Sequence, residues 1–126
     1  MAASNIEHEL DKLVQAWASQ QKSIYSGKRG CVGHHIHSRK NIMLRWDLKN
    51  IAPLTPEEHR LLHDGKITLD IPQETQEYLE GMMRVNYRTW LIINGMTEKE
   101  FFKKEKEKLK AELVDKYLYK SCITCR

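Results

Sequence analysis

The chain has 126 residues and a mass of 14.9 kDa, which is the size of one domain. Its hydrophobic fraction of 40% is typical of a globular protein. It contains no run of about 18 apolar residues, so no membrane-spanning segment is expected. The net charge of +4 is compatible with a polyanionic partner but does not require one. The N-terminus lacks the features of a signal peptide, so we expect a protein of the cytosol.

Helical periodicity begins near the N-terminus, from Asn5 to about Gln20. The apolar side chains in that segment recur at helical spacing: Ile6, Leu10, Leu13, Val14 and Trp17. A basic turn with the sequence SGKRG then ends the pattern at residues 26–30.

Residues 31–65 predict the order strand, loop, strand, helix. A strand-like run, CVGHHIHSRK, is followed by a polar and basic loop, and a second short strand covers residues 50–54. Thr55 is a suitable helix N-cap, Pro56 suits the first helical position, and Glu58 completes a capping box. This helix is expected to end near His63, before the Asp-Gly pair at 64–65.

Residues 73–120 predict two further helices. The first covers Gln73 to Asn94, with an apolar stripe and a C-capping glycine: Tyr78, Met82, Val85, Trp90, Ile93 and Gly95. A second capping box, Thr97 to Glu100, begins a long charged helix whose Lys/Glu alternation predicts a solvated, ion-paired face. The apolar positions expected to be buried are Phe101, Phe102, Leu109, Leu113, Val114 and Tyr117. We therefore predict one α+β, mostly helical domain over 1–126, with a core at 31–65 flanked by an N-terminal helix and two C-terminal helices.

Five of the six histidines lie between residues 34 and 63. His59 and His63 are four positions apart on the predicted helix, so their imidazoles share one face, which is a common arrangement for binding a transition metal. His34 and His35 are neighbours on a strand and point to opposite sides. One of them can supply a third ligand, while the other can serve as a general base because its pKa lies near neutrality.

The sequence GHHIHSRKNIMLRWDLKNIAPLTPEEHRLLH resembles the HNH, or ββα-metal, nuclease family. The signature residues would be His35, Asn50 and His59, and the successive spacings of fifteen, nine and four residues to His63 are similar to those of nuclease colicins. The intervening text, with Arg-Trp-Asp at 45–47 and then Asn and Pro, is closest to phage recombination nucleases of the NinG/Rap type. The resemblance implies that residues 31–65 form a ββα-metal finger, and that the protein acts in the cytoplasm of a bacterial or phage-infected cell.

The resemblance also implies a DNA endonuclease with a single-metal mechanism. Three imidazoles would hold one divalent cation: His34, His59 and His63. That cation would be Zn²⁺, Ni²⁺, Mn²⁺ or Mg²⁺, although imidazole ligands favour transition metals over Mg²⁺. His35 would activate the attacking water, and Asn50 would orient the loop that bears it. Arg39 and Arg45 are the candidates for contacting the scissile phosphate.

The cysteines raise the question of a structural zinc. Many relatives carry paired CxxC motifs around this core, and one such pair would fall at Thr55 and Glu58, neither of which is cysteine. Cys122 and Cys125 form a CxxC at the end of the chain, and Cys31 could join them if the last helix returned to the core. Free thiols are the alternative reading.

The expected partner is DNA, contacted mainly through its backbone, because phosphate contacts position a protein without specifying sequence. The Met82–Met83 region could also form a homodimer. Two other functions stay open: a non-catalytic zinc or nucleic-acid-binding module that retains the fold, and a helical structural protein with incidental histidines.

Overall fold

The structure is a computed structural model that describes the backbone of residues 2–124 and the side chains of residues 5–113. It confirms the α+β, mostly helical class. Its elements in chain order are α1 (Ala2–Ser19), β1 (Val32–His35), α2 (Ile42–Arg45), a short 3-10 helix η1 (Leu48–Asn50), β2 (Ile51–Leu54), α3 (Pro56–His63), α4 (Gln73–Met83), α5 (Tyr87–Ile93) and α6 (Glu98–Thr124). In the part of the chain that is described, no helix is both long and apolar enough to cross a membrane.

The two strands form an antiparallel pair in which His34 lies opposite Ala52 and His35 lies opposite Ile51. Helix α1 packs directly against β1 at Gly33. A Cβ added there would lie 2.9 Å from Cγ2 of Ile51 on β2 and 3.4 Å from Cβ of Ala18 on α1, so the close packing at this position depends on glycine. Gln15 of α1 also accepts a hydrogen bond from the Gly33 amide at 2.8 Å and donates one to its carbonyl at 3.3 Å. The N-terminal helix is therefore joined to the strand that carries the histidine pair.

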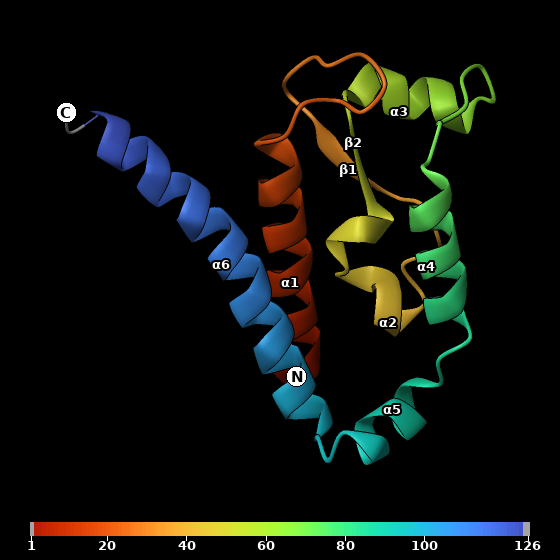
Figure 1. Cartoon of the computed structure of the whole chain (residues 1–126), viewed down its shortest axis with the longest axis vertical. Coiled ribbons are helices and arrows are strands. Elements are labelled where there is room, and N and C mark those ends of the chain that lie inside the picture. Colours follow the sequence, from red (N-terminus) through yellow and green to blue (C-terminus); the bar gives the residue numbers. More distant parts are fainter. Residues whose placement is uncertain (1, 125–126) are drawn as a thin grey trace.

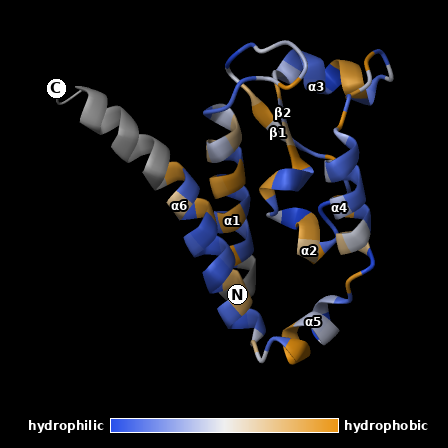
Figure 2. Cartoon of the chain, viewed as in Figure 1, coloured by the Kyte–Doolittle hydropathy of each residue, from blue (hydrophilic) through white to orange (hydrophobic). Residues whose placement is uncertain are grey.

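The hydrophobic core lies between α1, α6 and the segment that connects the strands. Figure 1 shows α1 and α6 running side by side, and an ion pair between Glu9 and Lys106 joins them. Hydrophilic residues dominate the described part of α6, as the sequence predicted (Figure 2). The buried members of the main cluster are Leu10, Val14, Trp46, Ile51, Phe101, Phe102 and Leu109. Of the other expected core positions on α6, Leu113 is only partly buried, and the side chains of Val114 and Tyr117 lie outside the described residues.

The segment between the strands differs from the polar loop predicted for it. It forms α2 and η1, and it buries Met43, Leu44 and Trp46. The side chain of Asn41 caps α2 by accepting a hydrogen bond from the Met43 amide. Asn50, predicted on the second strand, ends η1 instead and lies just before β2. The prediction was wrong because helices of three or four residues are too short to show a periodicity in sequence.

The single helix predicted from Gln73 to Asn94 is also wrong, because the chain breaks after Met83 and begins again at Tyr87. The side chain of Asn86 accepts a hydrogen bond from the Thr89 amide and caps α5. Asparagine is favoured at an N-cap because its side chain satisfies an amide that has no partner within the helix. Three helices therefore follow the central segment, and Ile93, predicted on the buried stripe, is 77% exposed.

Both predicted capping boxes are confirmed. In α3, Thr55 and Glu58 exchange side-chain and backbone hydrogen bonds, Pro56 occupies the first turn, and the helix ends at His63. At the start of α6, Thr97 and Glu100 make the same reciprocal pair. The capping box of α3 fixes where that helix begins, and so fixes the positions of its two histidines.

Candidate metal centre

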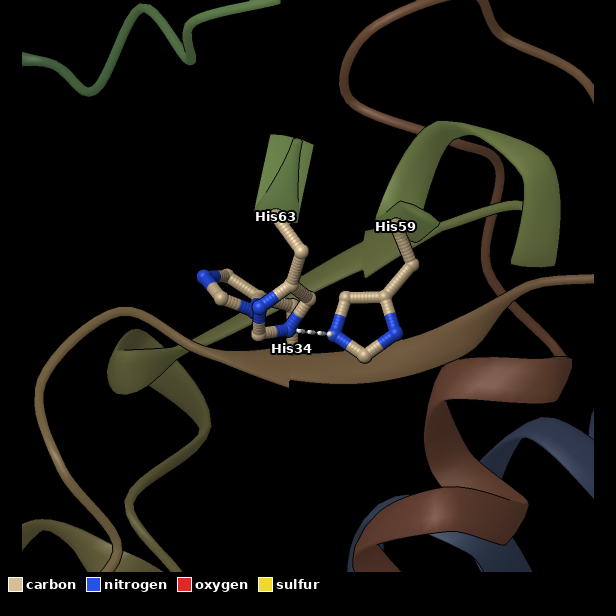
Figure 3. A group of neighbouring side chains, drawn as sticks. All are labelled: His34, His59 and His63. Atoms are coloured by element: carbon tan, nitrogen blue, oxygen red, sulfur yellow. Dashed lines mark hydrogen bonds between the residues drawn. The ribbon is translucent and has the colours of Figure 1, made fainter. Parts of the chain in front are cut away.

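Three imidazoles converge where α3 crosses the sheet. His34 comes from β1, while His59 and His63 come from successive turns of α3, and Figure 3 shows their rings gathered on one side of the strand. The Nε2 atoms of His59 and His63 are 3.2 Å apart. One ring nitrogen from each histidine can be chosen so that all three lie within 4.8 Å of one another. The structure thus brings together the three residues that were predicted as metal ligands.

The donor set suits a transition-metal ion. Two nitrogen ligands at about 2.1 Å from a tetrahedral ion are separated by about 3.4 Å, which is close to the His59–His63 distance. Both rings of that pair lie on a short helix of fixed register, and the third comes from a strand hydrogen-bonded in the sheet. Among the side chains of residues 5–113, this is the one group of three or more potential ligands that meets the spacing for a metal.

The protonation of these rings also favours metal binding. Burial, reinforced by the neighbouring His59, His63 and His35, lowers the pKa of His34 to about 4. Burial also lowers the pKa of His59, with a further contribution from His63. Because a histidine binds a metal through the lone pair of a neutral ring, these two side chains are in their ligating form at neutral pH.

His35 is held in a defined orientation beside this cluster. Its Nε2 lies 2.9 Å from the backbone oxygen of Arg45. A carbonyl oxygen can only accept a hydrogen bond, so the geometry requires that Nε2 carries the proton. In the neutral ring the lone pair is then on Nδ1, which is free to accept a proton from water.

Asn50 ties together the two ends of the segment between the strands. Its side chain is fully buried, accepts a hydrogen bond from the His37 amide at 2.9 Å, and donates to the carbonyls of His37 and Leu44 at 3.1 Å each. These contacts hold the chain on either side of the loop that follows His35. Its side-chain contacts are to His37 and Leu44, and the role of Asn50 in orienting the loop that bears the base stays a prediction.

The two arginines predicted to contact phosphate are both paired with Asp11 of α1. Arg45 reaches its carboxylate through Nε at 3.1 Å and through one terminal nitrogen at 2.7 Å. Arg39 makes a single contact at 3.0 Å, and its side chain is 58% exposed. Arg45 thus joins α1 to α2, and a phosphate contact by Arg39 stays a prediction.

Sequence reasoning missed a polar stripe on α1 that meets the central segment. Glu7, Asp11 and Gln15 follow one another at intervals of four residues, beside the apolar stripe of Leu10 and Val14. Glu7 lies 3.8 Å from Arg45, Asp11 accepts from both arginines, and Gln15 binds the Gly33 backbone. The regular spacing of three polar residues that border a buried stripe was the signal in the sequence.

Of the three cysteines predicted to bind a structural zinc, the structure describes the side chain of one. Cys31 is a buried free thiol whose pKa is raised by burial, and the Cys122 and Cys125 side chains lie outside the described residues. At Glu58, one of the two positions considered above for a CxxC pair, the buried carboxylate accepts hydrogen bonds from the Ser23 hydroxyl and the Thr55 amide. A hydrogen-bond network therefore links the loop at residues 20–30 to the start of α3.

No protein-family model matches this chain, and neither a curated protein nor a solved structure is significantly similar to it. The chemistry of the site therefore has to be inferred from its geometry and from the resemblance of its motif.

Proposed function

We propose that this protein is a metal-dependent endonuclease that hydrolyses phosphodiester bonds in DNA. The observation that carries the proposal is the pairing of a three-imidazole cluster with a fourth histidine, His35, whose Nε2–H is bound to a carbonyl. A metal site alone would suit a binding protein. An adjacent ring with a free Nδ1 lone pair supplies the proton acceptor that hydrolysis needs.

The roles of the residues follow from their contacts. His34, His59 and His63 bind the divalent ion, which when bound stabilises negative charge on the phosphate and the leaving oxygen. His35 accepts a proton from the attacking water through Nδ1 and keeps its orientation through the Arg45 carbonyl. Asn50 keeps the intervening loop in place through its three hydrogen bonds.

The arrangement of the elements supports the same proposal. β1, β2 and α3 come in this order along the chain, with α2 and η1 between the strands, and α3 packs on the strand pair. This order is compatible with the ββα-metal finger that the motif resembles. In this proposal the protein recognises DNA mainly through contacts with its phosphate backbone, in keeping with the net charge of +4. The predicted homodimer stays a prediction, to be measured by sedimentation equilibrium.

Nicking of supercoiled plasmid tests the proposal. The full chain is incubated with Zn²⁺, Ni²⁺, Co²⁺, Mn²⁺ or Mg²⁺ in turn, beside EDTA. His35→Ala removes the base, His63→Ala removes a ligand, and His8→Ala is the matched control, since His8 is exposed on α1 away from the motif. We expect metal-dependent nicking by the wild type and by His8→Ala, and its loss in the other two variants.

The wild-type protein and His35→Ala together distinguish a catalytic nuclease from a non-catalytic binding module. A variant that binds one equivalent of Co²⁺ but no longer nicks DNA supports a catalytic His35. If the wild-type protein binds the ion and DNA but none of the metals supports cleavage, the protein is the non-catalytic binding module instead. Cleavage that survives in His35→Ala would refute its assignment as the base.

A further inference from the structure

We infer that Asp11, on the N-terminal helix and outside the nuclease-like motif, is a positioning residue for His35. This inference rests on the proposed function. It adds α1 to the active site, although the histidine motif begins 23 residues later, at His34. The observation behind it is that one carboxylate, that of Asp11, binds the side chains on both sides of the Arg45–Trp46 peptide bond. The carbonyl of that bond accepts the hydrogen bond from His35.

Asp11 accepts hydrogen bonds from the side chains of both residues that flank this peptide bond. The carbonyl that accepts from His35 belongs to the bond between Arg45 and Trp46. On one side of the bond, the Arg45 guanidinium makes two hydrogen bonds to the carboxylate, at 3.1 and 2.7 Å. On the other side, Nε1 of Trp46 donates to the same carboxylate at 2.9 Å. A fork of this kind fixes orientation as well as distance, because both groups are planar.

The carbonyl of Arg45 needs such support because it stands at the end of α2. This helix has only four residues, so the last carbonyls lack partners within the helix and their direction is not set by a continuing turn. Trp46 is 2% exposed and packs against Phe102, which removes the freedom of the second flanking side chain. Asp11 and the core together therefore set the direction of the acceptor that His35 uses.

Asp11 is itself well anchored. Burial raises its pKa, but hydrogen bonds from Arg45 and Trp46 outweigh burial and hold the pKa below its ordinary value. The carboxyl is therefore ionised at neutral pH and can accept from all of its donors. Its helix is in turn fixed to β1 through Gln15 and Gly33, so the carboxylate and His35 belong to one rigid frame.

The first readout is the nicking rate of the full chain. Asp11→Asn keeps the size of the side chain but removes the charge and one acceptor. Val14→Ala is the matched control, since Val14 lies on the same helix, is 1% exposed, and has an apolar side chain that makes no hydrogen bond to Arg45 or Trp46. We expect kcat to fall about 10- to 100-fold in Asp11→Asn, as for loss of other groups that orient a catalytic residue, with KM unchanged. Val14→Ala is expected to keep the wild-type kcat below its melting temperature.

The second readout does not depend on cleavage. ¹⁵N NMR of the metal-free protein reports which nitrogen of His35 carries the proton, with the resonance assigned by its loss in His35→Ala. We expect the Nε2–H form in the wild type and in Val14→Ala, and a mixture of both tautomers in Asp11→Asn. An unchanged tautomer in Asp11→Asn, or a loss of kcat in Val14→Ala equal to that in Asp11→Asn, would overturn the inference. If the wild type cuts no DNA, the proposed function fails, and the NMR result still decides whether Asp11 positions His35.

Discussion

Asn50→Ala should destabilise the protein by about 3 kcal/mol, because its fully buried side chain makes three hydrogen bonds. A hydrogen bond within a protein contributes about 1 kcal/mol net, and a buried group left without a partner costs more. The Leu44 carbonyl keeps its bonds to the Trp46 and Asp47 amides after the change. The loss therefore falls mainly on the amide and carbonyl of His37.

Urea unfolding followed by tryptophan fluorescence measures this effect. With a slope of about 1.5 kcal/mol per M, a loss of about 3 kcal/mol lowers the midpoint by about 2 M. Asn41→Ala is the matched control, because it removes one capping hydrogen bond, to the Met43 amide, and should cost only about 1 kcal/mol. If the urea midpoint of Asn50→Ala fell no further than that of Asn41→Ala, the Asn50 hydrogen bonds to His37 and Leu44 would not stabilise the segment between the strands as argued.

Three further predictions concern the metal, the close packing at Gly33 and the response to acid. Zn²⁺ at 100 times its Kd should stabilise the protein by about 2.7 kcal/mol, which raises Tm by about 10 °C. EDTA should reverse the shift and His63→Ala should abolish it, whereas equal Tm values with and without Zn²⁺ would contradict the site. Gly33→Ala places a Cβ 2.9 Å from Ile51 Cγ2 and should cost about 1–3 kcal/mol in thermal unfolding. Gly81→Ala, in open space on α4, should be neutral or stabilising, and an equal loss in both variants would refute the close-contact argument. The lowered pKa of Asp11 means that its contribution is present above the ordinary value of 3.8 and is lost as pH falls through the folded-state value. The stability advantage of the wild type over Asp11→Asn should therefore shrink in acid, and an advantage that is constant down to pH 2 would show that the carboxylate is not held by its partners.

The helix that carries two of the candidate ligands was predictable because its signals are local. A capping box acts over three residues, and an i, i+4 pair shares a face in any α-helix. Thr55, Glu58, His59 and His63 therefore take their relative positions from the geometry of one helix, whatever packs around it. The same reasoning covers the start of α6 at Thr97 and the apolar face of α1.

The interruptions of regular structure were less predictable. The break between α4 and α5 depends on Asn86 capping a new helix, in competition with an apolar pattern that continues through it. Helices α2 and η1 are held by Asn41 and Asp47 caps and by burial of the residues between them. Such short elements are stabilised by tertiary contacts rather than by their own periodicity.

The sequence by itself identified the histidines that could bind a metal or accept a proton, and it placed His59 and His63 on one face because helical geometry is a local property. The tertiary structure alone decided what surrounds them. Asp11 meets Arg45 across 34 positions of the chain, and Ser23 meets Glu58 across 35. The Asp11–Arg45 pair forms because α1 buries its apolar stripe against β1 and α6, so a polar residue beside that stripe finds its partner only once the core is packed. No local window of sequence contains both members of such a pair, so the contact between them is a property of the folded chain.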